Sequence, residues 1–593
     1  MPSSFRSFSS RTLVAIGTCA LIVLVIVAIT GGFVIDAGPL HLSARRIAAP
    51  LVVTLLAWIA AGAIGRAELL ESAAAIDGFL DRHATAIGLV LAASAAAVGV
   101  AYGTYSASGA DASGYVSQAQ LLATGRSVME EPLARQVAWP DREWAFTPLG
   151  YRPGRTPGEL APTYPSGLPL AMAGAQVIAG EVGPYLVVPL LGAVVVLSTL
   201  ALGALLHSRP AGIIAAALVT TSPISVFQIV QPMSDVPVTA WWMVAMLFAV
   251  SPVPAGPLAA GATAGIALLT RPNLFPLAIP IALASAGWLG VRRERSAPRI
   301  LLAFASGLAP AIAVLLLMQW RWYGNPFTTG YGAVGDLFSA ANIGQNLRDY
   351  STRLLVGEKP AVVLAALSLL LLAFRRSGGA ASVRQAALTA LLVAIAVLAC
   401  YLPYAVFAEW WYLRFLLPAL PFAFVLVGAL LTNASRRLHP AVSGLAMLVV
   451  LAAACSFNIL EASRQEAFNM QRYEARYRTA GKYFDAILPA NAVVFSVQQS
   501  GSVRHYAQVP IVRWDLLRVD PDAALARLRT LGRRPYLVVE DWEATDLRAR
   551  FPQWPIARLD WTPRADIGDE RRVLLFDPAD RSTQARVITD RVH

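Results

Sequence analysis

Two acidic residues stand where a carboxylate can act on a group held at a membrane surface. Asp111 follows an apolar segment of membrane length at residues 85–106. Asp235 lies between Pro232 and Pro237, directly before another apolar segment. A carboxylate at such a boundary meets both lipid and water, so it can take a proton from a group at the bilayer surface. These positions suggest general-base catalysis, or the orientation of an acceptor group.

Both acids also have a simpler interpretation as helix caps. If residues 111–122 are helical, Asp111, Tyr115, Gln118 and Leu122 share one stripe whose acidic end faces water. Asp111 then lies at the helix start, where unsatisfied N–H groups favour a carboxylate. Asp235 could orient an acceptor or hold a metal, or it could simply cap its helix. The sequence alone leaves catalysis and capping open for both residues.

The composition identifies the kind of protein in which these residues lie. The chain has 593 residues, of which 56% are hydrophobic and 14% are charged, and its mean hydropathy is +0.56. A soluble protein has about twice that charged fraction. Arginines flank the apolar segments instead of forming one basic face, so the net charge of +12 indicates membrane orientation and not nucleic-acid binding. We predict a polytopic α-helical membrane protein, with membrane lipids as its surroundings.

About thirteen transmembrane helices are expected. They are predicted at residues 13–35, 47–65, 85–106, 184–206, 211–230, 237–250, 255–270, 274–290, 299–320, 360–374, 385–406, 412–432 and 441–460. The first segment is too long for the apolar part of a signal peptide, and we expect it to remain as an uncleaved helix. Residues 165–179 are apolar but short for a span, and we expect them to lie along the outer membrane surface.

Arginines in short loops predict the orientation. Three loops are expected in the cytoplasm because of the basic residues Arg292, Arg293, Arg295, Arg299, Arg375, Arg376, Arg384, Arg436, Arg437 and His439. The N-terminus is then cytoplasmic, and residues 107–183, 231–235, 321–359 and the tail after 461 lie on the outer face of the inner (plasma) membrane. Arg45 and Arg46 fall on the wrong side for this rule.

The C-terminal 133 residues change character. Strand-like runs at residues 492–497, 535–540 and 572–576 alternate with helical patterns at 472–487 and 521–531. We therefore predict a C-terminal extracytoplasmic α/β domain at 461–593. It follows an N-terminal membrane hairpin at 1–84 and a transmembrane domain at 85–460 with an outer-face loop at 107–183.

Short motifs follow Asp111 in a defined order. They are Tyr115 four residues later, YPSGLP from Tyr164, Ser234-Asp235, LTRP from Leu269, WYGNPF from Trp322, and YLRFLLPALP from Tyr412. In their order and sidedness, over roughly residues 85–430, these motifs resemble the bacterial integral-membrane glycosyltransferases of the GT-C superfamily. The nearest pattern is that of the protein mannosyltransferase and lipid A aminoarabinose transferase branch.

The resemblance implies a membrane glycosyltransferase of the inverting type. It would move a sugar from a polyprenyl-phosphate carrier to a lipid, glycan or protein acceptor on the extracytoplasmic face. Asp111 matches the catalytic carboxylate, and Asp235 is expected to support it. Arg271 and Arg414 suit the carrier phosphate because a guanidinium has forked donors, although snorkelling to lipid headgroups is their alternative. Further substrate-binding residues are expected at Tyr115, Gln118, Tyr164 and Glu409.

The sequence departs from the family pattern after the first acid. Many relatives carry a second acid there, whereas Ala112 and Ser113 follow Asp111 in this chain. Asp235 and Glu409 are the remaining acids that could supplement a metal site. The three cysteines lie within apolar segments, and the six histidines form no ligand pattern. We therefore expect catalysis without a metal or other cofactor.

Polar and aromatic residues outside these motifs have two interpretations. The loop at 126–163 suits sugar binding, or simply packing on the membrane surface, through Glu130, Glu131, Trp139, Asp141, Trp144, Tyr151 and Arg152. The C-terminal region has three residues that could contact an acceptor or simply pack: Arg504, Tyr506 and Trp514.

Two other classes of function remain open. A secondary transporter or lipid flippase usually keeps ionisable groups near the bilayer midplane, whereas the acids here gather at the outer rim. A non-catalytic scaffold that presents the C-terminal domain is compatible with the missing second acid.

Overall fold

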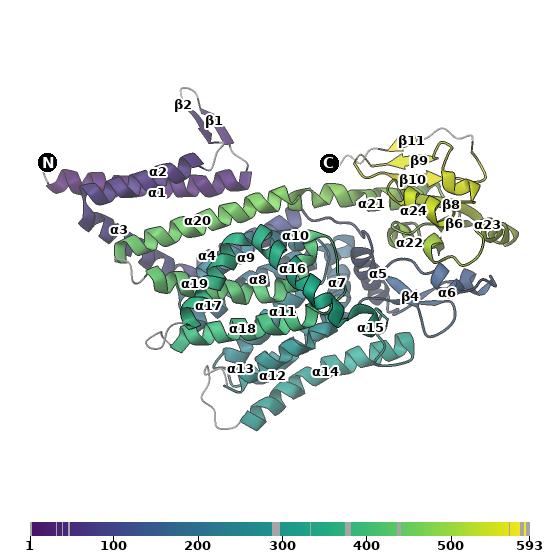
Figure 1. Cartoon of the computed structure of the whole chain (residues 1–593), viewed down its shortest axis with the longest axis horizontal. Helices are drawn as coiled ribbons and strands as arrows, with labels where there is room; N and C mark the ends of the chain where they lie inside the picture. The colour runs from purple at the N-terminus through teal and green to yellow at the C-terminus, as the bar shows by residue number, and fades with distance from the viewer. Residues whose placement is uncertain are drawn as a thin grey trace.

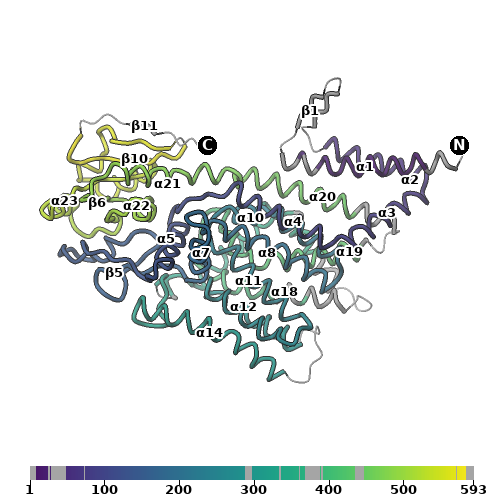
Figure 2. The backbone as a smooth tube through the Cα atoms, turned by 180° about the vertical axis from the view of Figure 1, so that it is seen from behind, coloured from purple at the N-terminus to yellow at the C-terminus, as the bar shows by residue number. Residues whose placement is uncertain are grey.

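The computed structural model describes residues 3–30, 33–37, 40–44, 48–287, 297–332, 334–373, 381–435, 440–568, 570–581 and 586–588. A helical body occupies the middle of the molecule, with the α1–α2 pair at one end and a β-sheet at the other (Figure 1). Two consecutive helices, α20 (Pro440–Arg464) and α21 (Met470–Ile487), run along the body and lead to the sheet; Figure 2 shows them from behind.

Each of the thirteen predicted segments overlaps a helix. The described helices before the C-terminal region are α1 (Ser3–Thr30), α2 (Ala48–Ile64), α3 (Arg66–Arg82), α4 (Ala84–Ala101), α5 (Asp111–Ala123), η1 (Pro132–Arg135), α6 (Arg142–Ala145), α7 (Gly167–Ala179), η2 (Gly180–Val182), α8 (Gly183–Leu206), α9 (Arg209–Thr221), α10 (Pro223–Ile229), α11 (Asp235–Val250), α12 (Gly256–Thr270), η3 (Pro272–Leu277), α13 (Ala278–Ser285), α14 (Ala297–Tyr323), α15 (Val334–Leu337), η4 (Ala340–Asn342), α16 (Ile343–Gly357), α17 (Lys359–Ala373), α18 (Ala381–Tyr401), η5 (Trp410–Ala419) and α19 (Leu420–Ser435). The first predicted segment ends too late, because α1 stops at Thr30 and a short strand, β1 (Phe33–Ala37), follows and pairs with β2 (Leu40–Ala44).

Fewer of these helices are long enough to cross a membrane by themselves. Over the described residues, five helical stretches have the necessary length and apolar character, or six if the bent pair α9–α10 counts as one span. These five are Ala84–Ala101, Gly167–Leu206, Ala297–Tyr323, Trp410–Ala434 and Met447–Arg464. Other predicted spans are shorter apolar helices, among them α11 and α12. The number thirteen therefore stays a prediction.

Small residues let the helices of the body approach closely. Gly261 on α12 lies against the backbone of α14, and Gly307 on α14 lies against that of α12, so that a Cβ at either position would overlap a carbonyl of the other helix. Such small-residue contacts are the usual way in which membrane helices pack. One large apolar core, which includes Trp242 and Phe422, joins α4, α8, α9, α11 and α19.

The C-terminal region contains a six-stranded sheet in the order β11-β9-β10-β8-β6-β7. Its strands are β6 (Ala492–Phe495), β7 (Ile511–Val512), β8 (Arg534–Glu540), β9 (Ala565–Ile567), β10 (Val573–Phe576) and β11 (Arg586–Ile588), and α21, α22 (Ser500–Ala507), α23 (Pro521–Thr530) and α24 (Glu543–Arg550) accompany them. Strand β8 pairs in parallel with β6 and antiparallel with β10. The three predicted strands and the two predicted helices of this region are confirmed as elements.

Both faces of this sheet are buried, but only one is covered by C-terminal residues alone. Alternate residues of β8 point to opposite faces of the sheet. Leu537 packs in the apolar core on one face, and Val538 packs in the core on the other. The core around Leu537 includes Leu133 and Phe146, which come from the segment after α5. That segment also forms a small antiparallel sheet, with order β3-β5-β4, from β3 (Met129–Glu130), β4 (Tyr151–Pro153) and β5 (Glu159–Pro162). The loop that follows Asp111 is thus part of the core of the C-terminal sheet.

Most of the arginines used to predict orientation cannot be placed. Arg45, Arg46, Arg292, Arg293, Arg295, Arg375, Arg376, Arg436, Arg437 and His439 lie outside the described residues. The predicted sidedness of the membrane therefore stays a prediction.

Candidate functional site

Asp111 is the first residue of α5, and its carboxylate is held by two side chains. Oδ1 accepts a hydrogen bond of 2.6 Å from the hydroxyl of Tyr164, and Oδ2 lies 2.9 Å from Nη2 of Arg414. The N-cap residue of α5 is Ala110, and among the described residues no backbone N–H donates to the Asp111 carboxylate, so it forms no capping hydrogen bond; it still lies in the first turn, where the helix start favours a negative charge. The side chain remains 31% exposed, which leaves part of the carboxylate open to a ligand.

These contacts keep the carboxylate charged. Burial alone raises the pKa of Asp111, but the charge of Arg414, the hydrogen bonds from Tyr164 and Arg414, and the charge of Arg271 together lower it below its ordinary value. Burial and the nearby charge of Asp111 hold the pKa of Tyr164 well above its ordinary value. At neutral pH the pair is therefore an ionised carboxylate and a neutral phenol that donates to it.

Asp235 opens α11 and forms a second acid–arginine pair. Its side chain has no exposed surface, and Oδ1 lies 2.9 Å from Nη2 of Arg271. Arg271 and the surrounding helices cover Asp235, and its predicted place on the outer face of the membrane stays a prediction. Ser234 is the N-cap residue of α11, and Asp235 lies in the first turn, where the helix start favours its negative charge.

A set of shared partners joins the two pairs into one network. Nε of Arg271 donates to Oγ of Ser234 over 2.9 Å, and the hydroxyl of Tyr115 donates to the same oxygen over 2.8 Å. The ring of Tyr115 lies 4.7 Å from that of Tyr164, which holds Asp111. Nη1 of Arg271 also donates to the hydroxyl of Tyr401 over 3.2 Å. The order Asp111–Tyr164–Tyr115–Ser234–Arg271–Asp235 is thus continuous, although its members come from α5, α11 and three loops.

Phe415 lies between the two arginines. The guanidinium of Arg271 is 5.6 Å from its ring centre and that of Arg414 is 5.5 Å from it, distances at which cation–π attraction operates. Sequence reasoning missed Phe415, Ser234 and Tyr401 as members of the site. Ser234 and Phe415 are inside motifs quoted for the resemblance, so their positions were visible although their roles were not.

The two arginines are buried and directed inward. Their side chains are 14% (Arg271) and 10% (Arg414) exposed, and each pairs with a carboxylate, so neither reaches out to headgroups as a snorkelling side chain does. Nε of Arg414 is buried without a hydrogen-bond partner among the described residues. Each guanidinium has five N–H donors, and this N–H of Arg414 donates to no described residue.

Two predicted substrate-binding residues do not join the network. Gln118 is buried on α5, and its amide has no hydrogen-bond partner within the described part of the chain. Glu409 precedes η5 and is exposed. The structure therefore brings together Asp111, Asp235, Tyr115, Tyr164, Arg271 and Arg414, whereas no hydrogen bond or ion pair between described residues joins Gln118 or Glu409 to them.

A small apolar cavity, with a volume of about 30 Å³, lies next to the network. It begins at Val236 and Thr239 on α11, directly beyond Asp235, and includes Leu417, three residues after Arg414. The rest of its wall is formed by Ala95, Val98, Gly192, Val195, Val196, Val219, Thr220, Ser225, Val226, Ile229 and Pro421. Its lining suits a hydrocarbon group.

The loop at 126–163 packs against protein. Trp139 stacks on Phe146 with ring centres 5.4 Å apart, beside the core of the C-terminal sheet. The guanidinium of Arg152 lies between Trp144, 5.5 Å away, and Tyr323, 5.1 Å away. Packing thus accounts for Trp139 and Phe146, whereas Trp144 is exposed, and a role of this loop in sugar binding stays a prediction.

Metal binding has no support from clustering of ligands. Across the described residues, no group of three or more His, Cys, Asp or Glu side chains is arranged to hold an ion. Asp111 and Asp235 each face an arginine instead.

No protein-family model matches the sequence, and no curated protein sequence matches it. The structure, by contrast, is similar to several solved structures. The ArnT structure from Cupriavidus metallidurans in the apo state matches with a TM-score of 0.54 at 13% identity, over 84% of this chain and 98% of that one. The same protein bound to undecaprenyl phosphate matches with a TM-score of 0.51 at 13% identity, over 82% and 97% of the two chains. The apo oligosaccharyltransferase of Archaeoglobus fulgidus matches with a TM-score of 0.50 at 12% identity, over 84% and 75%. The chain therefore has the fold of the GT-C glycosyltransferases.

Proposed function

We propose that this protein is a membrane glycosyltransferase that moves a sugar from a polyprenyl-phosphate carrier to an acceptor on the extracytoplasmic face. The observation that carries the proposal is the Asp111 carboxylate. It is ionised, oriented through both oxygens, and partly open, and it lies beside two buried arginines and an apolar cavity. The GT-C fold supports the same proposal.

The two arginines and the cavity suit the two parts of a lipid carrier. Arginine binds phosphate through charge-assisted, often paired hydrogen bonds, and Arg414 keeps an unused buried donor. The apolar lining of the cavity begins within one turn of both Asp235 and Arg414, so a phosphate at the arginines would have apolar side chains beside it for the start of its hydrocarbon chain. Undecaprenyl phosphate is bound in one of the ArnT structures that share this fold.

The proposed reaction exchanges one bond at the sugar's anomeric carbon for another. The bond from that carbon to the carrier phosphate breaks, and its electron pair leaves with the phosphate. A bond from the acceptor oxygen to the same carbon forms on the opposite face, which inverts the configuration. Asp111 accepts the acceptor's proton and later releases it to water. A carboxylate has about four lone-pair positions, of which Tyr164 and Arg414 use two, so it can still receive this hydrogen bond.

The low pKa of Asp111 defines how it would act. An ionised carboxylate of low pKa is a weak base, so it orients the acceptor and takes the proton only as the new bond forms. In this proposal Asp235 holds Arg271 in place, and Arg271 and Arg414 stabilise the leaving phosphate. Tyr115 and Tyr164 fix the network, while Gln118 and Glu409 remain expected contacts of a bound substrate. No metal is required, because the arginines supply the positive charge.

The arrangement in the membrane is part of the same proposal. We propose an N-terminal hairpin at 1–84, a transmembrane catalytic domain at 85–460 with about thirteen spans, and an extracytoplasmic α/β domain at 461–593. The N-terminus would be cytoplasmic and the membrane the inner (plasma) membrane. Lipids, glycans and proteins remain possible acceptors.

A panel of polyprenyl-phosphate sugars tests the function. Purified protein in lipid nanodiscs is given each donor with a mixture of lipid, glycan and peptide acceptors, and released polyprenyl phosphate is measured. We expect turnover with at least one donor, at a rate unchanged by Asp81→Asn, since Asp81 is exposed on α3 and far from the site in the fold. A wild-type protein that consumes no donor, in a panel where a characterised transferase does, contradicts the proposal.

A further inference from the structure

The loop that carries Asp111 needs support from outside itself. Residues 103–110 connect α4 to α5, and within them Tyr105 has a φ of 45° and Gly109 a φ of 54°. A left-handed conformation at a tyrosine costs free energy and persists only where neighbours impose it. Two hydroxyls of the loop, those of Thr104 and Ser106, are buried without hydrogen-bond partners among the described residues. The loop's own contacts therefore do not explain its conformation.

Two parts of the chain supply that support: the helical body, where the N–H of Thr104 donates to the Val230 carbonyl and the ring of Tyr105 contacts that of Tyr185, and helix α22 of the C-terminal region. The backbone N–H of Ala107 donates to the hydroxyl of Tyr506 over 2.8 Å. The N–H of Leu149 donates to Oγ of Ser500 over 3.0 Å. Between these two bonds, Gly501 lies against Ser113 in the first turn of α5, so closely that a Cβ at position 501 would overlap the Ser113 side chain. Three residues of one helix thus contact the chain on both sides of Asp111.

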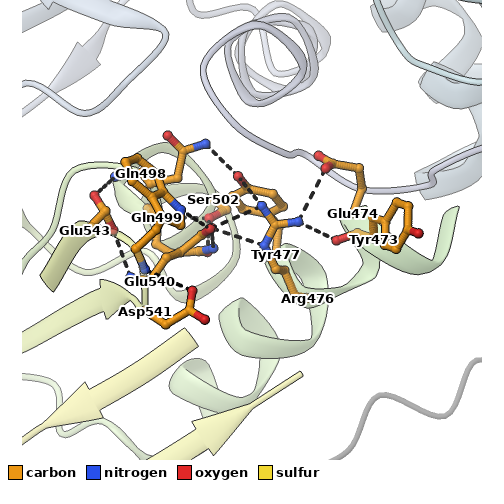
Figure 3. A network of polar contacts seen from close by, with 11 residues as sticks. Tyr473, Glu474, Arg476, Tyr477, Gln498, Gln499, Ser502, Glu540, Asp541 and Glu543 are labelled. Carbon is orange, nitrogen blue, oxygen red and sulfur yellow. Dashed lines mark hydrogen bonds and ion pairs between the residues drawn. The ribbon is translucent and has the colours of Figure 1, made fainter. Parts of the chain in front are cut away.

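The start of α22 is itself fixed by a buried polar network (Figure 3). The N–H of Gln498 donates to Oε1 of Glu543 over 2.9 Å, and the amide of Gln499 donates to Oε1 of Glu540 over 2.7 Å. Glu540 in turn pairs with Arg476 on α21 over 3.1 Å, and both side chains are almost fully buried. A satisfied buried network of this kind fixes a single backbone position.

Helix α21 also determines where Tyr506 lies. Gly481 on α21 faces the ring of Tyr506, and a Cβ there would come within 2.6 Å of the ring. A glycine at this position lets the tyrosine reach Ala107, which is why the hydroxyl ends at the Asp111 loop.

We propose that α22 is a positioning element of the catalytic site, and that Tyr506 and Gly501 are positioning residues that set where the Asp111 carboxylate lies. This inference rests on the proposed function, and it assigns the C-terminal region a part in catalysis without any contact to substrate. A displacement of about 1 Å in a catalytic group can cost on the order of 10²-fold in rate. Loosening α22 should therefore affect the chemical step more than donor binding.

Two variants with matched controls test the proposal. Tyr506→Phe removes the acceptor of the Ala107 N–H while keeping the ring, and Gly501→Ala pushes α5 through Ser113. Their controls are Tyr483→Phe, on α21 beside the same sheet, and Gly344→Ala, on α16 where an added Cβ meets nothing within 4 Å. We measure kcat and the donor KM together with hydrogen exchange at residues 103–114 and at β8, which reports on folding of the sheet.

The proposal predicts a specific combination of results. Tyr506→Phe and Gly501→Ala lower kcat by about 10- to 100-fold, change KM less than about threefold, and speed exchange at 103–114 but not at β8. The controls stay at wild-type values. In the double variant Gly501→Ala with Ser113→Gly, the overlapping side chain is gone, so that part of kcat and of the exchange protection returns.

The two measurements separate failure of this inference from failure of the proposed function. Unchanged exchange at 103–114 overturns the inference, whatever the activity. Faster exchange with kcat within twofold of wild type also overturns it, because the loop then moves without consequence. If wild type consumes no donor, the proposed function fails, and exchange alone still decides whether α22 holds the loop.

Discussion

Asp235 and Arg271 form an almost fully enclosed ion pair, so replacing Asp235 with asparagine leaves a buried charge without its partner. The Asp235 side chain has no exposed surface and that of Arg271 is 14% exposed. Removing one member of a buried pair typically costs about 3–5 kcal/mol. Arg271 keeps its hydrogen bonds to Ser234 and Tyr401, so we expect the lower end, about 3 kcal/mol, for Asp235→Asn.

A double-mutant cycle separates the pair from its surroundings. Arg271→Gln alone leaves the Asp235 charge buried and should cost a similar amount, whereas the double variant has no unpaired charge. We expect the double variant to be more stable than the sum of the single effects predicts, by about 2 kcal/mol or more. The assay is reversible unfolding in mixed micelles, followed by tryptophan fluorescence.

The exposed pair of Asp81 and Arg209 is the control for charge removal. Its atoms are 3.7 Å apart and its side chains 54% and 60% exposed, so Asp81→Asn should change stability by less than about 0.5 kcal/mol. If Asp235→Asn is as mild as Asp81→Asn, or if the cycle shows no coupling, Asp235 and Arg271 do not form the buried pair described above.

Two further predictions concern carboxylates, and a third concerns metal dependence. Tyr164→Phe removes a hydrogen bond that favours the charged form of Asp111 and is worth about 1.5 kcal/mol for a partly exposed group. The pKa of Asp111 should therefore rise, and the acid limb of the kcat/KM profile should move to higher pH. The control Tyr323→Phe, which only frees the Pro162 carbonyl, should leave that limb in place. Burial raises the pKa of Glu543 to about 7 from its ordinary 4.5, so the folded state holds a proton that the unfolded chain has lost, and stability falls as pH rises from about 4.5 to 7. Glu543→Gln should remove that slope in pH-dependent unfolding, and the exposed Glu570→Gln should not. Incubation with EDTA should leave turnover within twofold of the untreated protein, and a loss that Mg²⁺ or Mn²⁺ restores would show that a metal is used.

The sequence predicted the helices well because each is an apolar run with its own length and ends. All thirteen predicted segments overlap helices, and the residues that open α5 and α11 are the two predicted acids. Pairing Asp111 with Arg414 was out of reach, because those residues are 303 positions apart and their contact depends on how η5 packs against α11. The burial of Asp235 was missed for the same reason, since only the folded body shows that Arg271 covers it.

Cooperation between the outer-face loop and the C-terminal region was also invisible in the sequence. In the sequence, Leu133 and Phe146 are ordinary apolar residues of an irregular loop. The face of the C-terminal sheet that they cover is formed by strands that begin more than 340 residues later. The strands themselves were predictable from their β-branched runs, whereas β7 and β9 are two and three residues long and give no periodic signal.

The central claim is that Asp111 is the carboxylate on which sugar transfer depends. The direct test is single-turnover transfer by wild type and by Asp111→Asn, with a donor identified from the panel and its binding measured separately. Asparagine keeps the size of the side chain and an oxygen for Tyr164, so the account predicts donor affinity within about threefold and transfer slower by about 10²- to 10⁴-fold. Transfer by Asp111→Asn at a rate near that of wild type, with the donor bound equally well, would contradict the claim.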